Sequence, residues 1–149
     1  MDKRIGIIGN GFVGEALAFA FSSKFETRVY DIDKFKSLNS INEVYECEII
    51  FVCVPTPMFS DGTQDLSYIN NVFKNAITGP LYIIKSTILP GTTLSLIKKY
   101  NLKIIFSPEF LTERTAKLDM LTQSRIILGG DKENTKFARE IFEQRFKNR

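Results

Sequence analysis

The 149-residue sequence has no histidine, only two cysteines (Cys47 and Cys53), and no apolar run longer than six residues. Without histidine it lacks the commonest general base and the commonest zinc ligand. Two cysteines suggest neither a metal site nor a disulfide framework. We therefore expect no metal, and both features are typical of a reduced, cytoplasmic compartment.

Membrane and nucleic-acid partners are not expected either. A membrane-spanning helix needs about 20 apolar residues, and residues 1–4 lead directly into a predicted strand, which leaves no room for a signal peptide. The 20 basic and 17 acidic residues give a net charge of +3, without a run of five or six like charges. A nucleic-acid surface needs a concentrated basic stripe. Length and the 44% hydrophobic content fit one globular domain, residues 1–149.

Short apolar runs alternate with longer segments of helical periodicity. The predicted strands are residues 4–8, 27–30, 48–54, 81–85, 103–106 and 125–128, and the predicted helices are residues 12–23, 66–77, 92–100 and 134–146. Residues 33–45 have room only for a brief helix. Strands that alternate with helices predict an α/β fold, a doubly wound Rossmann domain with a mostly parallel six-stranded sheet.

A glycine-rich segment follows the first predicted strand and opens the first predicted helix. The pattern G-x-G-x-x-G is matched by Gly9, Asn10, Gly11, Phe12, Val13 and Gly14. In this context Gly9 permits the tight turn, Gly11 lets the backbone approach a pyrophosphate, and Gly14 lets the helix pack closely on the sheet. The alternative is a glycine-rich turn that binds nothing.

An acidic residue ends the second predicted strand. Asp31 follows Gly9 by 22 residues, and a carboxylate there can accept hydrogen bonds from both adenosine ribose hydroxyls. It would also repel the 2′-phosphate of NADP, so the predicted cofactor is NAD. Asp33 is the second candidate for this role, although a solvated turn residue is the simpler interpretation. Lys36 is placed at the adenine–ribose edge, with an exposed helix side chain as its alternative.

Three more segments lie at the carboxyl ends of predicted strands, where open α/β sheets bind their ligands. They are FVCVPTP (residues 51–57), IKSTILPGT (residues 84–92) and SPEFLTE (residues 107–113). Together with the glycine-rich segment, and in this order, they closely resemble the N-terminal domain of the UDP-glucose/GDP-mannose dehydrogenases. The resemblance extends to about residue 130.

That resemblance implies an NAD-dependent oxidation of a nucleotide sugar at C6, through an aldehyde and a cysteine thioester. It implies that Glu109 is the general acid/base, acting through water, and that the Thr87 hydroxyl holds a water or the reacting oxygen. The remaining roles are also implied by position: Val54, Pro55, Thr56, Ser86, Thr87, Ile88 and Glu113 beside the cofactor, and Glu109, Phe110 and Leu111 beside the substrate.

Each of these residues has a structural alternative. Thr56 and Thr87 can be strand-end hydroxyls that satisfy loop backbone. Glu109, after Pro108, can be a carboxylate favoured by a helix dipole. Phe110 and Leu111 would then be core residues.

The sequence also departs from the family. Its catalytic-cysteine motif, FGG-x-C-x-x-KD in a second domain, is not found in residues 1–149. Cys53 is interpreted as a buried apolar residue inside the third strand, and Cys47, between Glu46 and Glu48, as a thiol of raised pKa. The segment after Asp31 is much shorter than in the family. Arg114 stands where a small residue is usual, and either obstructs the sugar or pairs with its diphosphate.

The sequence therefore predicts an NAD-binding domain of an oxidoreductase that acts on a sugar CH–OH group and is incomplete alone. Its expected partners are a nucleotide sugar and either a second copy or a separate chain that carries the cysteine domain. Two alternatives stay open: a non-catalytic NAD-binding module, and oxidation only to the aldehyde, which needs a base but no cysteine.

Overall fold

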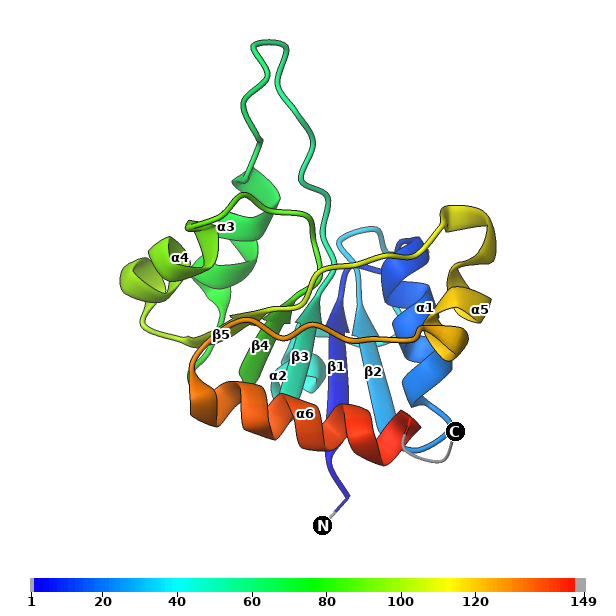
Figure 1. The fold of residues 1–149 in the computed structure, drawn as a ribbon. Helices are drawn as coiled ribbons and strands as arrows, with labels where there is room; N and C mark the ends of the chain where they lie inside the picture. The colour runs from blue at the N-terminus through cyan, green and yellow to red at the C-terminus, as the bar shows by residue number, and fades with distance from the viewer. Residues whose placement is uncertain (1, 147–149) are drawn as a thin grey trace.

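Five short strands form the centre of the fold in the computed structural model, which describes residues 2–146 (Figure 1). The strands are β1 (Arg4–Ile8), β2 (Glu26–Tyr30), β3 (Ile49–Val52), β4 (Leu81–Ile84) and β5 (Lys103–Phe106). All neighbours pair in parallel, in the order β2-β1-β3-β4-β5. The predicted α/β fold is confirmed.

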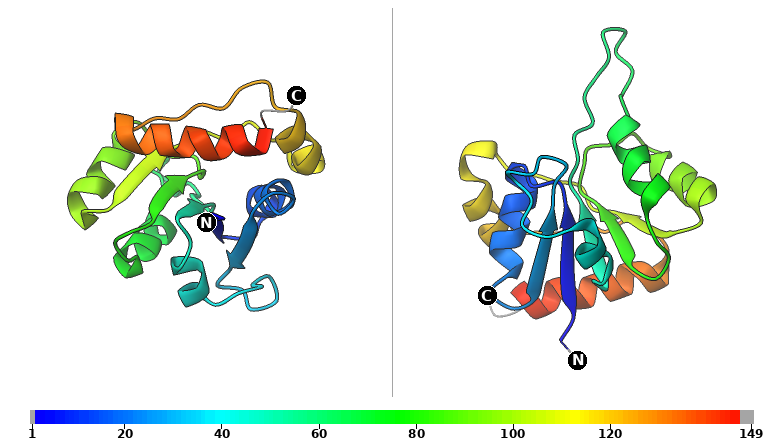
Figure 2. Two further views of the ribbon diagram at one scale, coloured as in Figure 1. Left: turned by 90° about the horizontal axis from the view of Figure 1, so that it is seen from below. Right: turned by 180° about the vertical axis from the view of Figure 1, so that it is seen from behind.

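Helices cover both faces of the sheet (Figure 2). One face carries α1 (Phe12–Phe21), α5 (Ala116–Thr122) and α6 (Lys132–Phe146), and the other carries α2 (Ile41–Tyr45), α3 (Ser67–Asn75) and α4 (Thr92–Tyr100). Successive side chains of a strand point to opposite faces. In β3, Ile49 and Phe51 therefore join the core beneath α1 and α6, whereas Ile50 and Val52 join the core beneath α3 and α4. Strands buried on both faces need apolar residues at every position.

The predicted sixth strand is not formed. Residues 125–128 run across the direction of the strands in Figure 1, and pairing is limited to one antiparallel bridge, in which Phe106 and Gly129 exchange two hydrogen bonds of 2.8 Å. Ile126 and Leu128 still pack on the core while Ile127 is exposed. The side chains of this segment alternate between buried and exposed as in a strand, which explains why the sequence predicts a strand there. The backbone, however, does not make the hydrogen bonds of a paired strand.

The sheet ends at β2 because the connection from β2 to β3 is short. A Rossmann sheet commonly places a further strand beyond this position, but residues 31–48 contain only α2. The predicted brief helix is confirmed, and a capping box stabilises its start: the Ser40 hydroxyl accepts the Glu43 N–H, and the Glu43 carboxylate accepts the Ser40 N–H.

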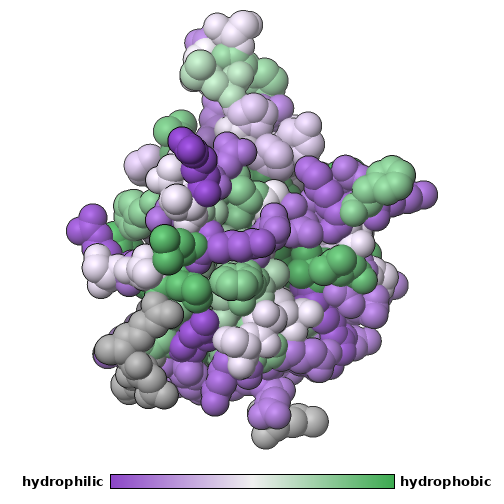
Figure 3. All heavy atoms as spheres, turned by 90° about the vertical axis from the view of Figure 1, so that its right-hand side faces the viewer, coloured by the Kyte–Doolittle hydropathy of each residue, from purple (hydrophilic) through white to green (hydrophobic). Residues whose placement is uncertain are grey.

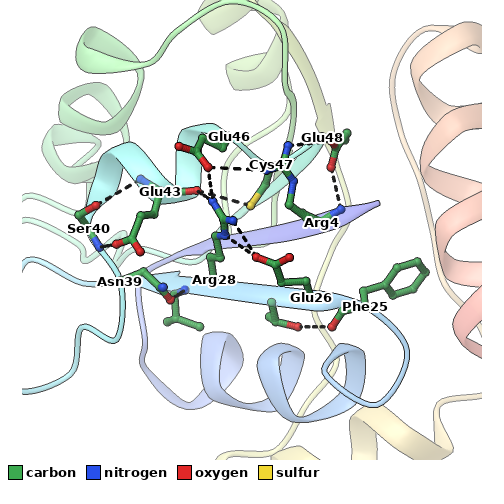
Figure 4. A network of polar contacts seen from close by, with 12 residues as sticks. Arg4, Phe25, Glu26, Arg28, Asn39, Ser40, Glu43, Glu46, Cys47 and Glu48 are labelled. Atoms are coloured by element: carbon green, nitrogen blue, oxygen red, sulfur yellow. Dashed lines mark hydrogen bonds and ion pairs between the residues drawn. The ribbon is translucent and has the colours of Figure 1, made fainter. Parts of the chain in front are cut away.

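A polar network closes the amino-terminal side of the sheet (Figure 4). The Arg28 guanidinium contacts the carboxylates of Glu46 and Glu26, at 2.5 and 2.7 Å, and these contacts raise its pKa. The Arg4 backbone N–H and guanidinium both bind Glu48. This network joins β1, β2 and the start of β3, and it lies opposite the edge at which the ligand motifs gather.

A hairpin-like segment that the sequence pattern does not predict extends from the body between β3 and α3. This arm, residues 57–65, is closed by a bridge between Met58 and Gln64 and by the Phe59 N–H to Thr63 carbonyl bond of 2.7 Å. Its apolar side chains are open to solvent, with Met58 74% and Phe59 52% exposed. Figure 3 shows the arm rising above a face on which polar and apolar residues are mixed.

Candidate cofactor and active site

The glycine-rich loop joins β1 to α1 at the carboxyl edge of the sheet. Gly9 has a φ of +99°, and a Cβ there would lie 2.6 Å from the Cys53 carbonyl oxygen, so this turn requires glycine. At Gly11, no heavy atom of the described residues lies within 4 Å of an added Cβ. Gly11 is the N-cap of α1, whose first N–H groups lack intrahelical partners. The loop therefore offers backbone donors to an anion with no side chain in the way.

Asp31 lies beside this loop. Its Oδ2 accepts the Asn10 N–H at 2.7 Å, and its Oδ1 accepts the Asp33 N–H at 2.8 Å. The Asn10 side-chain amide donates to the Lys36 carbonyl at 2.8 Å, which ties the loop to the segment after β2. Each carboxylate oxygen keeps a lone pair, so Asp31 can still accept hydrogen bonds from a ligand.

Two cavities flank the loop and share four lining residues. The first, of about 350 Å³, has Asp31, Asp33 and Lys36 in its wall. The second, of about 400 Å³, has Thr56, Lys85 and Glu109 in its wall. Both are also lined by Gly11, Cys53, Val54 and Pro55. They therefore form one cleft that passes over Gly11, as an extended dinucleotide requires.

The loops after β3 and β4 are hydrogen-bonded to each other in the second cavity. Ser86 Oγ donates to the Val54 carbonyl at 2.6 Å. The Thr87 carbonyl accepts two side-chain donors, Thr56 Oγ1 and Gln64 Nε2, each at 2.7 Å. Gln64 belongs to the arm, so the base of the arm holds the Thr87 peptide in place. The Thr56 hydroxyl thus satisfies a loop carbonyl, which is the structural alternative to a cofactor contact, and Thr56 also lines the cavity.

Glu109 lines the second cavity and is paired with a buried lysine. Its Oε1 accepts the N–H groups of Phe110 and Leu111, at 2.9 and 3.2 Å. Its Oε2 lies 3.3 Å from Lys85 Nζ, an ion pair whose geometry falls short of a hydrogen bond. The Glu109 side chain is 10% exposed. A carboxylate thus faces the cleft beside Lys85.

Other predicted residues occupy different positions. Leu111 lines the second cavity, but Phe110 is 57% exposed, with the Arg125 guanidinium over its ring. Ile88 is buried beneath α4 and lines neither cavity of the cleft. Glu113 begins a 3-10 turn and lines a separate hollow with Phe12 and Arg114.

Neither thiol has the character of a nucleophile. Burial raises the pKa of Cys53 to about 12, partly opposed by Lys85. Burial also raises the pKa of Cys47 to about 11, against the opposing effect of Arg28. The predicted direction for Cys47 is confirmed, but its main cause is burial and not the neighbouring carboxylates. Cys53 follows the end of β3 at Val52 and does not lie inside the strand, which corrects the predicted strand end.

Several residues of the cleft are not predicted by the sequence pattern. Lys85 is predicted only as the end of a strand, although a charge directly after an apolar run is a usable signal. Tyr68, Asn71 and Val72 of α3 line the first cavity. They come from a helix to which the sequence assigns no function, because their approach to Asp31 depends on how α3 packs.

Neither a metal site nor a membrane-spanning helix is found in the described part of the chain. Within residues 2–146, no group of three His, Cys, Asp or Glu side chains is arranged to hold a metal ion. No helix in the same part of the chain is long and apolar enough to cross a membrane.

Comparison with known proteins agrees with this geometry. The family described as "UDP-glucose/GDP-mannose dehydrogenase family, NAD binding domain" matches residues 34–146. A UDP-N-acetyl-D-mannosamine dehydrogenase of Methanocaldococcus jannaschii is 31% identical and is matched over 96% of this chain and 43% of its own length. A UDP-glucose 6-dehydrogenase of Streptococcus pneumoniae is 29% identical, over 94% of this chain and 44% of its own.

A solved structure shares the fold. The UDP-glucose dehydrogenase of the archaeon Pyrobaculum islandicum superposes with a TM-score of 0.86 at 22% identity, over 96% of this chain and 44% of that one. The chain therefore spans less than half the length of these relatives. The cleft fits the cofactor of the matched domain, because Asp31, the open loop at Gly11 and the cavity beside Glu109 follow one another along it. This chain belongs to the UDP-glucose/GDP-mannose dehydrogenase family and is an NAD-binding domain of that family.

Proposed function

We propose that residues 1–149 are the cofactor-binding half of an oxidoreductase that oxidises the C6 alcohol of a nucleotide sugar. The observation that carries this proposal is that Asp31, Gly11 and Glu109 line one continuous cleft. The names of the relatives, which act on UDP-glucose and UDP-N-acetyl-D-mannosamine, support the substrate class. The catalytic-cysteine domain would come from outside these residues.

The proposed roles follow from position along the cleft. Asp31 accepts the adenosine ribose hydroxyls, and the N–H groups at the start of α1 bind the pyrophosphate. NAD, when bound, supplies the hydride acceptor. Glu109 holds or moves a proton through water beside the reacting carbon, and Thr87 holds a water or the substrate oxygen. Two further roles rest on the family resemblance alone, because Phe110 and Glu113 do not line this cleft: backbone contact of Phe110 and Leu111 with the substrate, and approach of Glu113 to the nicotinamide ribose.

We also propose a cytoplasmic location, which is supported by the two free thiols, Cys47 and Cys53.

Asp31 should decide the choice between NAD and NADP. We expect calorimetric titration of the unmodified chain to show tighter binding of NAD than of NADP. Asp31→Ala removes charge-assisted hydrogen bonds worth about 1.5–3 kcal/mol, so NAD affinity should fall about 10–100-fold. The ratio of NAD affinity to NADP affinity should also become smaller. Asp31→Asn removes the charge but keeps one of the two oxygens that accept the Asn10 and Asp33 N–H groups, so it disturbs the loop less than Asp31→Ala and tests the effect of the charge on NADP binding.

Two results would contradict this assignment. Equal or tighter binding of NADP by the unmodified chain would remove the role of Asp31. A larger loss of NAD affinity in Asp33→Ala than in Asp31→Ala would transfer that role to Asp33, which lines the same cavity.

A further inference from the structure

One charged residue of the described chain is almost fully buried. Lys85 is 5% exposed and directly follows β4. In the register of β4 and β5, Ile84 faces Phe106, so Lys85 is adjacent to Ser107 at the carboxyl edge of the sheet. A lysine is rarely buried unless its ammonium is paired, because desolvating a charge is costly. The position therefore requires an explanation.

The surroundings of Lys85 present three oxygens to its ammonium, two as hydrogen-bond acceptors and one as an ion-pair partner. Its Nζ donates to Ser107 Oγ at 3.2 Å and to the Pro108 carbonyl at 3.3 Å, and it lies 3.3 Å from Glu109 Oε2. An ammonium has three N–H groups, and here it faces three oxygens from three consecutive residues. With its donors directed at the loop after β5, Lys85 is not arranged to bind a ligand itself.

Lys85 provides the ion-pair partner of the second carboxylate oxygen of Glu109, Oε2. Two backbone N–H groups occupy Oε1, but Oε2 is buried and has no hydrogen-bond partner among residues 2–146. The Lys85 ammonium is the positive charge that faces this oxygen. A buried carboxylate without its cation is strongly disfavoured. The contact therefore helps to fix the direction of the Glu109 side chain.

We propose that Lys85 is a positioning residue, whose ammonium fixes the direction of the Glu109 carboxylate in the wall of the cleft. Lys85 directly follows β4, and Glu109 lies in the loop after the neighbouring strand β5. The ion pair between them therefore links the loop that carries Thr87 to the loop that carries Glu109. The purpose of this arrangement rests on the proposed function, in which Glu109 handles a proton. The pairing itself is measured without turnover.

A double-mutant cycle on the folded chain tests the pairing. We expect Lys85→Met, which keeps length without charge, to lower the melting temperature by about 6–20 °C, because it leaves the Glu109 carboxylate buried and unpaired. Glu109→Gln leaves the Lys85 ammonium without its opposite charge and should also lower the melting temperature. The double variant removes both charges and should melt above Lys85→Met alone. If Lys85→Met does not fold, a folded double variant gives the same answer.

An exposed pair is the matched control. Lys117 and Glu15 form an ion pair at 3.0 Å with side chains 52% and 60% exposed. The same cycle with Lys117→Met and Glu15→Gln should show almost no coupling, because surface pairs are screened by solvent. A double variant of Lys85 and Glu109 that melts at or below Lys85→Met would overturn the proposal.

Amide NMR spectra distinguish positioning from a general structural role. Lys85→Met should move the amide signals of Phe110 and Leu111, which report on Glu109 Oε1, and Glu109→Gln should move the same two signals. Unchanged signals in folded Lys85→Met would contradict the proposal. If the signals move but the chain binds no NAD, the pairing stands and the proposed function fails.

Discussion

Replacement of Gly11 by valine should weaken NAD binding at least about 100-fold while the domain stays folded. A Cβ at Gly11 meets no heavy atom of residues 2–146 within 4 Å, and its φ of −79° is open to any residue. The added side chain would instead occupy the cleft where both cavities meet. Losing one or two charge-assisted hydrogen bonds to a pyrophosphate costs about 3 kcal/mol or more. Calorimetric titration with NAD measures the loss.

The control for this substitution is Gly129→Val. Gly129 lies away from the cleft, and an added Cβ would be 3.7 Å from the Phe106 carbonyl oxygen, an ordinary contact. It should leave NAD affinity unchanged. Circular dichroism of Gly11→Val should show a native spectrum, with a loss in melting temperature of a few degrees at most for the altered N-cap. A native spectrum together with unchanged NAD affinity would show that Gly11 forms the turn but has no role in NAD binding.

The second prediction concerns the product that the chain forms without a cysteine domain. We expect the pure chain, given NAD and UDP-glucose, UDP-N-acetylmannosamine or GDP-mannose, to form no uronic acid. Oxidation to the acid in this family passes through a thioester, which requires a thiolate. With pKa values of about 12 and 11, Cys53 and Cys47 are ionised at pH 7 only to about one part in 10⁴–10⁵. Glu109 can assist proton transfer by a factor of about 10²–10⁴ but cannot replace the covalent step.

Three results separate the remaining hypotheses. Sugar acid that forms only after a separate protein with the cysteine domain is added would support a half-enzyme. NADH and aldehyde without acid, lost in Glu109→Gln, would indicate simple alcohol oxidation. NAD binding with neither product in any mixture would favour a non-catalytic module. Steady production of acid by the chain alone, abolished by Glu109→Gln, would show that the chain is a complete enzyme.

Features that depend on neighbouring residues in the chain are predictable from the sequence. The turn from β1 to α1 favours glycine at position 9 because its φ of +99° is a local backbone conformation that other residues rarely adopt, although the close approach of the Cys53 carbonyl adds a long-range reason. Asp31 follows β2, an edge strand of which only Val29 is buried, whereas the central strands β3 and β4 are buried on both faces and have an apolar residue at each step. Because parallel strands end at one edge of a sheet, the position of each motif directly after a strand is enough to predict that the motifs meet in one cleft.

Features that depend on contacts between distant segments are decided only by the tertiary structure. Residues 125–128 have the pattern of a strand, but β5 accepts a single bridge from this segment, and so the sheet has five strands within residues 2–146. The ion pair of Lys85 with Glu109 and the bond from Gln64 to Thr87 cross 24 and 23 positions of the chain. No local preference encodes such contacts, because they exist only when parallel pairing brings the ends of β3, β4 and β5 together.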